Sequence, residues 1–323
     1  MLDPTHEPIL AAALRAPSAH NAQPWRLVED EGMQCYELHY DHTDYLPYDP
    51  DDRDAYLCLG AFVETLSLAA IRHGQRAQFD GVFSRAGSDL FVGRISLRPA
   101  HSGDAGDVLA EPAADRHTNR SEYDITPLPA ALVEELHVLG CVMVAPDAMS
   151  RLVAKASVCA WRDPRFVDDL HTWMKLDDNA APVGMTPAGL PLTRVESAAL
   201  RLAFKAKRLP ALLARVFASR DVRLLRHATA VAVLQADSLA PQELFDAGRR
   251  LLRAWVAIGA AGFAYHPISI AVDRTETVGG VAAISSTPCP VAVFRVGHPT
   301  GEAPRSNRRP LADVLRTAKP VPA

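Results

Sequence analysis

A short string near the N-terminus holds the residues best suited to bind a polar ligand. Residues 16–25 read Ala-Pro-Ser-Ala-His-Asn-Ala-Gln-Pro-Trp, with Ser18, His20, Asn21 and Gln23 between two prolines. Prolines stiffen a loop, so these side chains can be preorganised around a planar polar ligand. The alternative is an ordinary connection from a helix to a strand, with polar side chains that cap its ends. The string by itself favours neither interpretation.

Two further strings carry arginines at spacings that suit a phosphate. Residues 116–123 read Arg-His-Thr-Asn-Arg-Ser-Glu-Tyr, so Arg116 and Arg120 stand four apart with Thr118 between them. Guanidinium groups donate forked, charge-assisted hydrogen bonds to phosphate oxygens, and a hydroxyl adds a neutral donor. Residues 305–310, Arg-Ser-Asn-Arg-Arg-Pro, add more cations. Exposed arginine clusters are usually solvated surface, and each string alone leaves that alternative open.

Together these strings resemble the nitroreductase family of flavin enzymes. Arg116-x-Thr118-x-Arg120, followed by an aromatic residue, resembles the family's opening R-x-S-x-R-x-F signature. Residues 252–269 resemble its long core helix and the turn that faces the flavin, and residues 305–310 its basic C-terminal element. The family pattern P-S-x-x-N-x-Q-P-W is matched in full, by Pro17, Ser18, Asn21, Gln23, Pro24 and Trp25. Residues 182–226 have no counterpart in the small members.

The order of the motifs departs from that of ordinary family members. There the arginine signature precedes P-S-x-x-N-x-Q-P-W within one subunit, whereas here each half of the chain carries one of the two. Ordinary members are homodimers with two flavins at the subunit interface, so the resemblance implies two fused halves that retain one flavin site. The layout resembles the Acg-like subgroup of single-chain pseudo-dimers.

A glycine spacing points to the same duplication. Gly60 and Gly74 are 14 residues apart along one expected long helix, and so are Gly248 and Gly262 along another. In a fused dimer these would be the two core helices. Coincidence is the alternative, because glycine commonly follows the last residue of a helix.

Hydrophobic periodicity predicts the elements that position the strings. Expected helices cover residues 7–16, 55–73, 129–139, most of 149–176, the basic stretch that ends near 226, and 241–261. Expected strands cover residues 25–28, 35–40, 91–97, 142–145, 229–234 and 291–296. The sequence therefore predicts an α+β, nitroreductase-like fold of two tandem half-units, with antiparallel or mixed sheets flanked by helices. The expected halves are residues 1–110 and 111–323, the second with a lid-like insertion at 182–226.

Composition excludes several classes of protein. The 323 residues, 48% hydrophobic and 22% charged, predict a folded chain of about two domains. The formal net charge of −4 argues against wholesale binding of nucleic acid. The longest apolar run, Val256–Tyr265, is shorter than the roughly 20 residues that cross a bilayer. Five cysteines without a C-x-x-C pair indicate reduced thiols in a cytoplasmic protein and no metal site.

A basic stretch lies within the expected insertion. Residues 194–226 contain nine lysines or arginines against two acidic residues. A solvated helical face is one interpretation of this stretch. A lid over the flavin, or contact with an anionic membrane or a dinucleotide phosphate, is the other.

The resemblance implies an FMN-dependent oxidoreductase that takes hydride from NAD(P)H and passes electrons to nitroaromatic or quinone-type acceptors. The arginine strings would hold the phosphate and ribityl chain, the N-terminal string would contact the ring, and the turn at residues 267–269 would place an N–H near flavin N5. Cofactor contacts are expected from Ser18, His20, Asn21, Gln23, Arg116, Thr118, Asn119, Arg120, Ile268, Ser269, Arg305 and Arg308. No catalytic side chain is predicted, since the flavin carries the chemistry.

Two other functions remain open at this stage. One is a non-catalytic protein of the Acg-like type that stores FMN under a lid, and the other is a flavin-free relic of the fold. The expected partners are NAD(P)H and a small-molecule electron acceptor. We expect no nucleic-acid partner, no membrane span, and a monomer or weak dimer.

Overall fold

The N-terminal part of the chain builds a five-stranded sheet against one long helix. The computed structural model describes residues 3–40, 49, 51–87, 89–104, 106–190, 192–206 and 209–317. The strands lie in the order β10-β1-β2-β4-β3, and β1 and β2, which cover the strands expected at 25–28 and 35–40, pair in antiparallel orientation. The elements of this part are α1 (Glu7–Ala13), the 3-10 helix η1 (Ala19–Asn21), β1 (Trp25–Asp30), β2 (Cys35–Tyr40), α2 (Arg53–Arg72), β3 (Gln75–Ala86) and β4 (Asp89–Pro99).

The C-terminal part builds a second sheet, in the order β5-β9-β7-β6, with β8 also paired to β9. Its elements are η3 (Pro112–Asp115), β5 (Tyr123–Asp124), α3 (Ala130–Val138), β6 (Cys141–Val144), α4 (Pro146–Arg162), α5 (Pro164–Trp173), α6 (Arg194–Lys205), α7 (Leu209–Arg226), β7 (Ala230–Gln235), α8 (Pro241–Ala260), β8 (Ala264–Pro267), η4 (Ser269–Ala271), α9 (Thr275–Ser285), β9 (Pro290–Pro299), α10 (Leu311–Val314) and β10 (Leu315–Thr317). Two halves of sheet and helix confirm the expected α+β fold.

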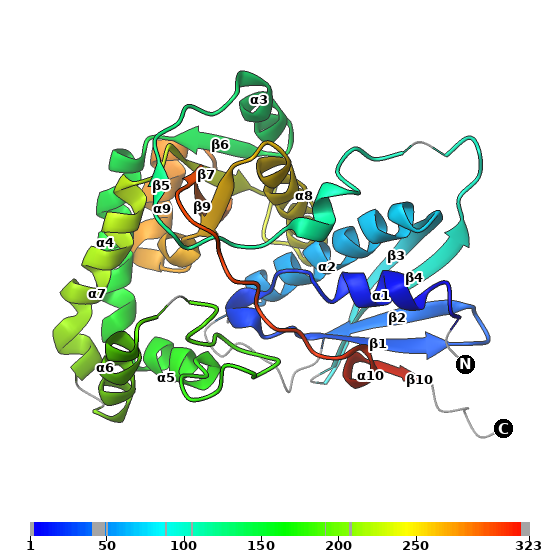
Figure 1. Ribbon diagram of the computed structural model, residues 1–323, viewed down its shortest axis with the longest axis horizontal. Coiled ribbons are helices and arrows are strands. Elements are labelled where there is room, and N and C mark those ends of the chain that lie inside the picture. Colours follow the sequence, from blue (N-terminus) through cyan, green and yellow to red (C-terminus); the bar gives the residue numbers. More distant parts are fainter. Residues whose placement is uncertain are drawn as a thin grey trace.

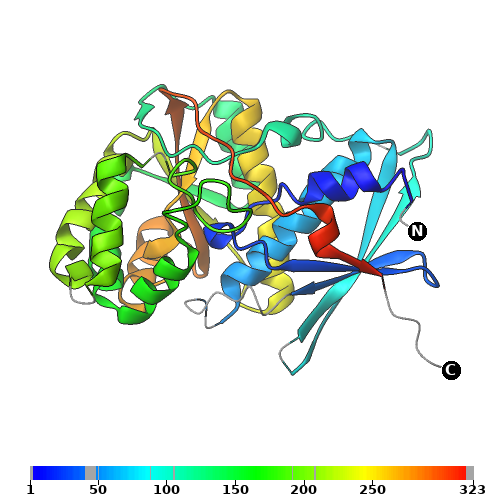
Figure 2. The same cartoon turned by 60° about the horizontal axis from the view of Figure 1, so that its bottom comes forward.

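Helices α2 and α8 cross between the two sheets (Figure 2). At the crossing, Gly60 of α2 meets the backbone carbonyl of Phe245, and Gly248 of α8 meets that of Leu57. Only glycine lets two helix backbones approach so closely, because any Cβ would occupy the space of the opposing carbonyl. The two glycines singled out in the sequence therefore mark one shared helix contact at the centre of the molecule.

The apolar composition of α2 is explained by its place in this core. Among the described helices, α2 is the one that is long and apolar enough to cross a membrane, but 83% of the window concerned is buried inside the protein. Its buried Glu64 accepts hydrogen bonds from Arg249 Nε at 2.9 Å and from Arg253 Nη1 at 2.8 Å, both on α8. The interface between the two helices is thus apolar, with ion pairs from Glu64 to Arg249 and Arg253.

The end of the chain returns to the first sheet. β10 pairs in parallel with β1, with Leu315 opposite Leu27. Figure 1 shows this segment, in red, running from β9 in the second half across to β10 beside β1. The two halves are therefore connected both through the α2–α8 crossing and through an exchanged strand.

Helices α4 to α7 form the outer wall of the second half (Figure 1). The stacked rings of Trp161 and Phe217, 4.0 Å apart, tie α4 to α7. The expected helix over 149–176 divides at Asp163, whose side chain caps α5. Residues 174–190, which we call the strap, follow α5 and precede α6. Within the strap, Met174 and Met185 form an isolated parallel β-bridge.

Candidate functional site

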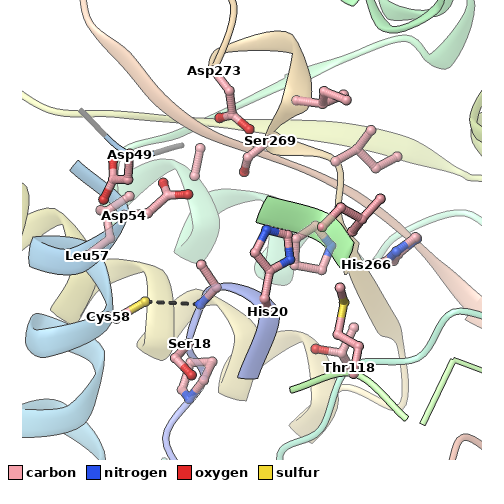
Figure 3. Close-up of a pocket in the computed structure, with 18 of the residues that line it drawn as sticks. Ser18, His20, Asp49, Asp54, Leu57, Cys58, Thr118, His266, Ser269 and Asp273 are labelled. Atoms are coloured by element: carbon pink, nitrogen blue, oxygen red, sulfur yellow. Dashed lines mark hydrogen bonds between the residues drawn. The ribbon is translucent and has the colours of Figure 1, made fainter. Parts of the chain in front are cut away.

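Two adjoining cavities lie where the halves meet. The larger has a volume of about 440 Å³ and the smaller about 80 Å³. Figure 3 shows the larger cavity, with Cys58 of α2, Ser18 and His20 of the N-terminal string, and His266 and Ser269 of the second half around it. Residues that line both cavities are Pro17, Ser18, His20, Thr118, Arg120 and Met185. Strings far apart in the sequence therefore meet at one site.

The N-terminal string adopts a backbone that few side chains prefer. His20, Asn21 and Gln23 have φ angles of 50°, 58° and 54°, in the left-handed region. The hydroxyl of Ser18 accepts a hydrogen bond from the N–H of Gln23 at 3.0 Å, which closes the loop. Such backbone conformations persist only where the surrounding fold enforces them, and they are concentrated at ligand sites.

The side chains of Asn21 and Gln23 hold neighbouring backbone segments in place. Buried Gln23 donates from Nε2 to the carbonyl of Pro182 at 2.7 Å and accepts from the N–H of Arg309 at 2.9 Å. Asn21 Nδ2 donates to the carbonyl of Gly184 at 3.1 Å. The string thus fastens the strap and the C-terminal segment to the first half, and of the two side chains only Asn21 lines the smaller cavity.

Four arginines surround the smaller cavity: Arg15, Arg116, Arg120 and Arg308. In the described part of the chain none of them has a carboxylate within 4.0 Å. Burial, with the like charges of Arg116 and Arg15, lowers the pKa of Arg308 to about 9, and burial also lowers the pKa of Arg15 and Arg120. Within the described residues, the buried Nε of Arg308 has no hydrogen-bond partner. An anion would supply the countercharge that this cluster lacks and an acceptor for that Nε.

The arginine signature is held by hydrogen bonds to the second sheet. Arg116 Nη1 donates to the hydroxyl of Tyr265 at 2.6 Å, and the N–H of Asn119 donates to the carbonyl of Tyr265 at 3.2 Å. Arg295, fully buried on β9, donates to the carbonyl of Ser121 at 2.6 Å. These contacts fix the register of the segment, so that Arg116, Thr118 and Arg120 face the cavities.

Three of the predicted site residues lie away from both cavities. Gln23 is buried in the contacts described above. Asn119 is also buried, and its amide donates to the carbonyl of Gly301 at 2.9 Å. Arg305 forms an ion pair with Asp115 at 2.7 Å on the surface. Contact of these three with a cofactor stays a prediction.

The turn after β8 brings backbone donors to the larger cavity. The N–H of Ile268 donates to the carbonyl of Val293 at 2.7 Å. Ser269 and Ile270 are the first residues of η4, and the first N–H groups of a helix have no partner within it. Both residues line the larger cavity. Their N–H groups, and not that of Ile268, are therefore the donors available to a ligand.

Comparison with known proteins shows that the chain is similar to nitroreductases. A Serratia protein named as a probable NAD(P)H nitroreductase, PigM, is 24% identical over 353 residues, which cover 99% of this chain and 96% of that protein. The similarity therefore extends over both halves in their order. It supports assigning the chain to the nitroreductase family. No family model matches it.

Other proteins match a smaller part of this chain or match it in fold alone. A Mycobacterium tuberculosis protein, provisionally named an NAD(P)H nitroreductase, is 28% identical over 51% of this chain and 49% of its own length. The crystal structure of the FMN-dependent nitroreductase NfnB from Mycobacterium smegmatis, with NADPH, gives a TM-score of 0.40 at 19% identity, covering 65% of this chain and 100% of that chain. A nitroreductase structure from Anabaena variabilis gives 0.45 at 12% identity, covering 88% and 82%.

One end of the larger cavity carries carboxylates that sequence patterns do not reveal. Asp49, Asp54 and Asp273 lie together at one side of the larger cavity (Figure 3). Arg53 donates to Asp54 at 2.9 Å and to Asp273 at 2.5 Å. Burial raises the pKa of Asp49 to about 7 and that of Asp273 to about 6. The larger cavity is thus acidic at the end where these three meet, while arginines surround the adjoining cavity.

A neutral histidine, His266, also lines the larger cavity. Burial, with the nearby charges of Arg120 and Arg295, lowers the pKa of His266 well below its usual range. Arg295 Nε donates to His266 Nδ1 at 3.2 Å, which leaves the single ring proton on Nε2. His266 is therefore placed as a neutral hydrogen-bond donor. The described residues contain no group of three His, Cys, Asp or Glu side chains that could hold a metal ion.

The outer wall of the second half closes the larger cavity from one side. Trp161 of α4, Phe166 and Leu170 of α5, Met185 of the strap and Leu224 of α7 all line it. The expected insertion at 182–226, apart from residues 191, 207 and 208, which lie outside the described residues, thus contributes to the site through the strap and α7. Most of the basic side chains of α6 and α7 lie elsewhere.

Proposed function

We propose that the chain binds one FMN across its two halves and uses it to transfer hydride from NAD(P)H to nitroaromatic or quinone-type acceptors. The phosphate would lie in the smaller cavity and the ring in the larger one. The observation that carries this proposal is the cluster of arginines without carboxylate partners that opens directly into a larger, mostly apolar cavity. A flavin nucleotide joins a dianion to a planar ring in the same way.

The arginine cluster suits the phosphate group. Arg116 and Arg120 approach from the signature string, and Arg308 approaches from the C-terminal segment, so the two strings converge on one small cavity. Like charges that are partly buried together repel each other and lack solvation. A bound phosphate would relieve both costs, and the unpartnered Nε of Arg308 provides a further donor.

The larger cavity suits the isoalloxazine ring. Leu57, Leu251, Trp255 and Ile268 give it apolar walls, which exclude water from a bound ring. When bound, FMN supplies the capacity to accept and donate hydride. The protein's part is to orient the ring, and the N–H groups of Ser269 and Ile270 are placed to donate to its polar edge.

The same reasoning extends to the organisation of the chain. We propose two half-units, residues 1–110 and 111–323, that each supply a complementary part of one site, as in the Acg-like subgroup. The contact that dimerises ordinary members would then be the internal α2–α8 crossing, which leaves a monomer or weak dimer. We propose a cytoplasmic setting, where NAD(P)H is available.

A second candidate function is storage of FMN without turnover. The observation that favours it is the strap, which Gln23 and Asn21 fasten over the site by hydrogen bonds of 2.7 and 3.1 Å. A strap that stays closed would keep NAD(P)H from the ring while it holds the cofactor.

Steady-state kinetics separates the two functions. Protein loaded with FMN is mixed with NADH or NADPH and with menadione or nitrofurazone, and oxidation of the nicotinamide is followed. The oxidoreductase predicts turnover well above that of the same concentration of free FMN, and the rate falls when Arg308→Ala empties the site. Bound FMN with turnover no faster than free FMN would support storage and exclude the enzyme.

A further inference from the structure

A histidine and a carboxylate from opposite halves face each other in the larger cavity. His20, in the strained N-terminal string, places its Nε2 3.4 Å from Oδ2 of Asp169 on α5. The His20 side chain is 27% exposed, whereas that of Asp169 is 1% exposed. In Figure 3 His20 projects into the middle of the cavity, between Asp54 and His266.

Asp169 is hidden from solvent and incompletely satisfied. Its Oδ1 is buried and has no hydrogen-bond partner among the residues that the structure describes, and both residues line the cavity. In the described part of the chain, the one cationic group in ion-pair distance of this carboxylate is the imidazole of His20. A carboxylate in that position orients the ring and compensates the positive charge of a protonated imidazole. The other ring nitrogen, Nδ1, forms no hydrogen bond within the described residues.

We propose that His20, oriented by Asp169, donates the proton that an electron acceptor needs when it receives hydride. This inference rests on the proposed function and identifies a catalytic residue for it, with Asp169 as a positioning residue. It does not concern the hydride step itself, which needs no side-chain acid.

The proton balance of the reaction requires such a donor. A quinone becomes a hydroquinone by taking up one hydride, which brings two electrons and one hydrogen, and one proton. The imidazolium N–H bond of His20 breaks as the O–H bond of the product forms, and water then restores the proton. For a nitro group the hydride and one proton give the nitroso product and one water. The reductant is NAD(P)H, acting through the flavin.

Other titratable groups in the cavity are less suited to this step. Oδ2 of Asp49 accepts from the N–H of Ala55 at 2.9 Å, and Asp273 is bound to Arg53. His266 has its Nδ1 engaged and a pKa well below its usual range, so it is neutral. Burial raises the pKa of the Cys58 thiol, so this group is a poor acid.

Two acceptors separate proton donation from a structural role. Menadione needs a proton on reduction, whereas ferricyanide takes one electron and no proton. We measure both rates for His20→Gln, for Asp169→Asn and for the control His137→Gln on the distant helix α3. Stopped-flow reduction of the bound flavin by NAD(P)H and FMN affinity are measured for each variant.

For His20→Gln we expect menadione reduction to fall by about 10²-fold while ferricyanide reduction stays within about threefold. In Asp169→Asn the rate of menadione reduction should fall by about 10-fold, because the imidazole remains but is less well oriented. The solvent isotope effect on menadione reduction should also disappear in His20→Gln. His137→Gln should match the parent protein.

Two outcomes would overturn the inference. One is an equal loss with both acceptors, which would show that His20 only shapes the site. The other is an unchanged menadione rate in His20→Gln. A parent protein that does not bind FMN, or does not turn over, would instead contradict the proposed function.

Discussion

Gly60 of α2 and Gly248 of α8 occupy equivalent positions on either side of one helix crossing. A Cβ on Gly60 would lie 1.9 Å from the carbonyl oxygen of Phe245, and a Cβ on Gly248 would lie 2.2 Å from that of Leu57. Fourteen residues after each, Gly74 and Gly262 end their helices with φ of +65° and +80°. This reciprocal contact is what an interface between two related half-units would produce.

Substitution at this crossing should destabilise both halves together. Gly60→Ala or Gly248→Ala should lower the free energy of unfolding by about 1–3 kcal/mol or more, because the helices must separate to admit the methyl group. Gly259→Ala is the matched control on α8, with no atom within 4 Å of the added Cβ. Alanine there should be neutral or stabilising by about 0.5–1 kcal/mol. Urea denaturation measures all three, and equal effects at Gly60 and Gly259 would contradict the close crossing.

The smaller cavity predicts a phosphate-specific effect of Arg308. Arg308→Ala should weaken FMN binding by about 2–4 kcal/mol and leave riboflavin, which lacks the phosphate, nearly unaffected. Arg305→Ala, three residues earlier, removes a surface arginine paired with Asp115 and should have a much smaller effect. Calorimetric titration of each variant with both ligands provides the comparison. If Arg308→Ala weakened the binding of FMN and riboflavin equally, the assignment of the phosphate to this cavity would be wrong.

Gln23 should matter for stability more than for contact with a ring. Gln23→Ala removes the side chain that bonds to the carbonyl of Pro182 and to the N–H of Arg309, which should cost about 1–3 kcal/mol. It should also loosen the strap and speed its cleavage by a protease. Gln242→Ala, at the exposed start of α8, serves as the control. If the strap of Gln23→Ala resisted the protease as well as that of the parent protein, the Gln23 amide would not be what holds the strap in place.

Asp49 should make the stability of the chain depend on pH. Burial raises the pKa of Asp49 from its ordinary value near 3.8 to about 7, so its contribution to stability is complete below pH 4 and is lost as the pH rises through 7. Asp49→Asn should therefore stabilise the protein at pH 8, by about 1–3 kcal/mol, and change little at pH 4. Asp177→Asn, at an exposed carboxylate, should show no such difference. Unfolding curves at the two pH values decide, and a stabilisation that is equal at both would refute the assignment.

Much of the site could be predicted from local strings because each string carries its own chemistry. Ser18, Thr118, Arg120 and Arg308 stand in patterns dense in polar or basic residues, and the fold brings all four to the two cavities. The long helices were predictable for a similar reason, since their apolar faces repeat at the helical period. The exact partners were not: Asn21 and Gln23, expected at the ring, bond to the strap and the C-terminal segment.

The remaining features depend on contacts between distant residues. β3 has no fully buried residue in its 12 positions, so its apolar signal is weak. α9 contains two adjacent glycines, which weaken the helical signal. The carboxylates of Asp54 and Asp273 come together only through Arg53, and Asp169 meets His20 only when α5 packs against the N-terminal string. No local pattern encodes these pairings.

The number of flavins per chain tests the central claim most directly. Two fused halves with complementary parts of one site predict a calorimetric titration that saturates at one FMN per chain, with the flavin spectrum perturbed on binding. Arg308→Ala should weaken that single transition by about 2–4 kcal/mol. Saturation at two FMN per chain would mean that each half carries a complete site, and no binding at all would mean that the arginine cluster serves another anion; either result would contradict the account.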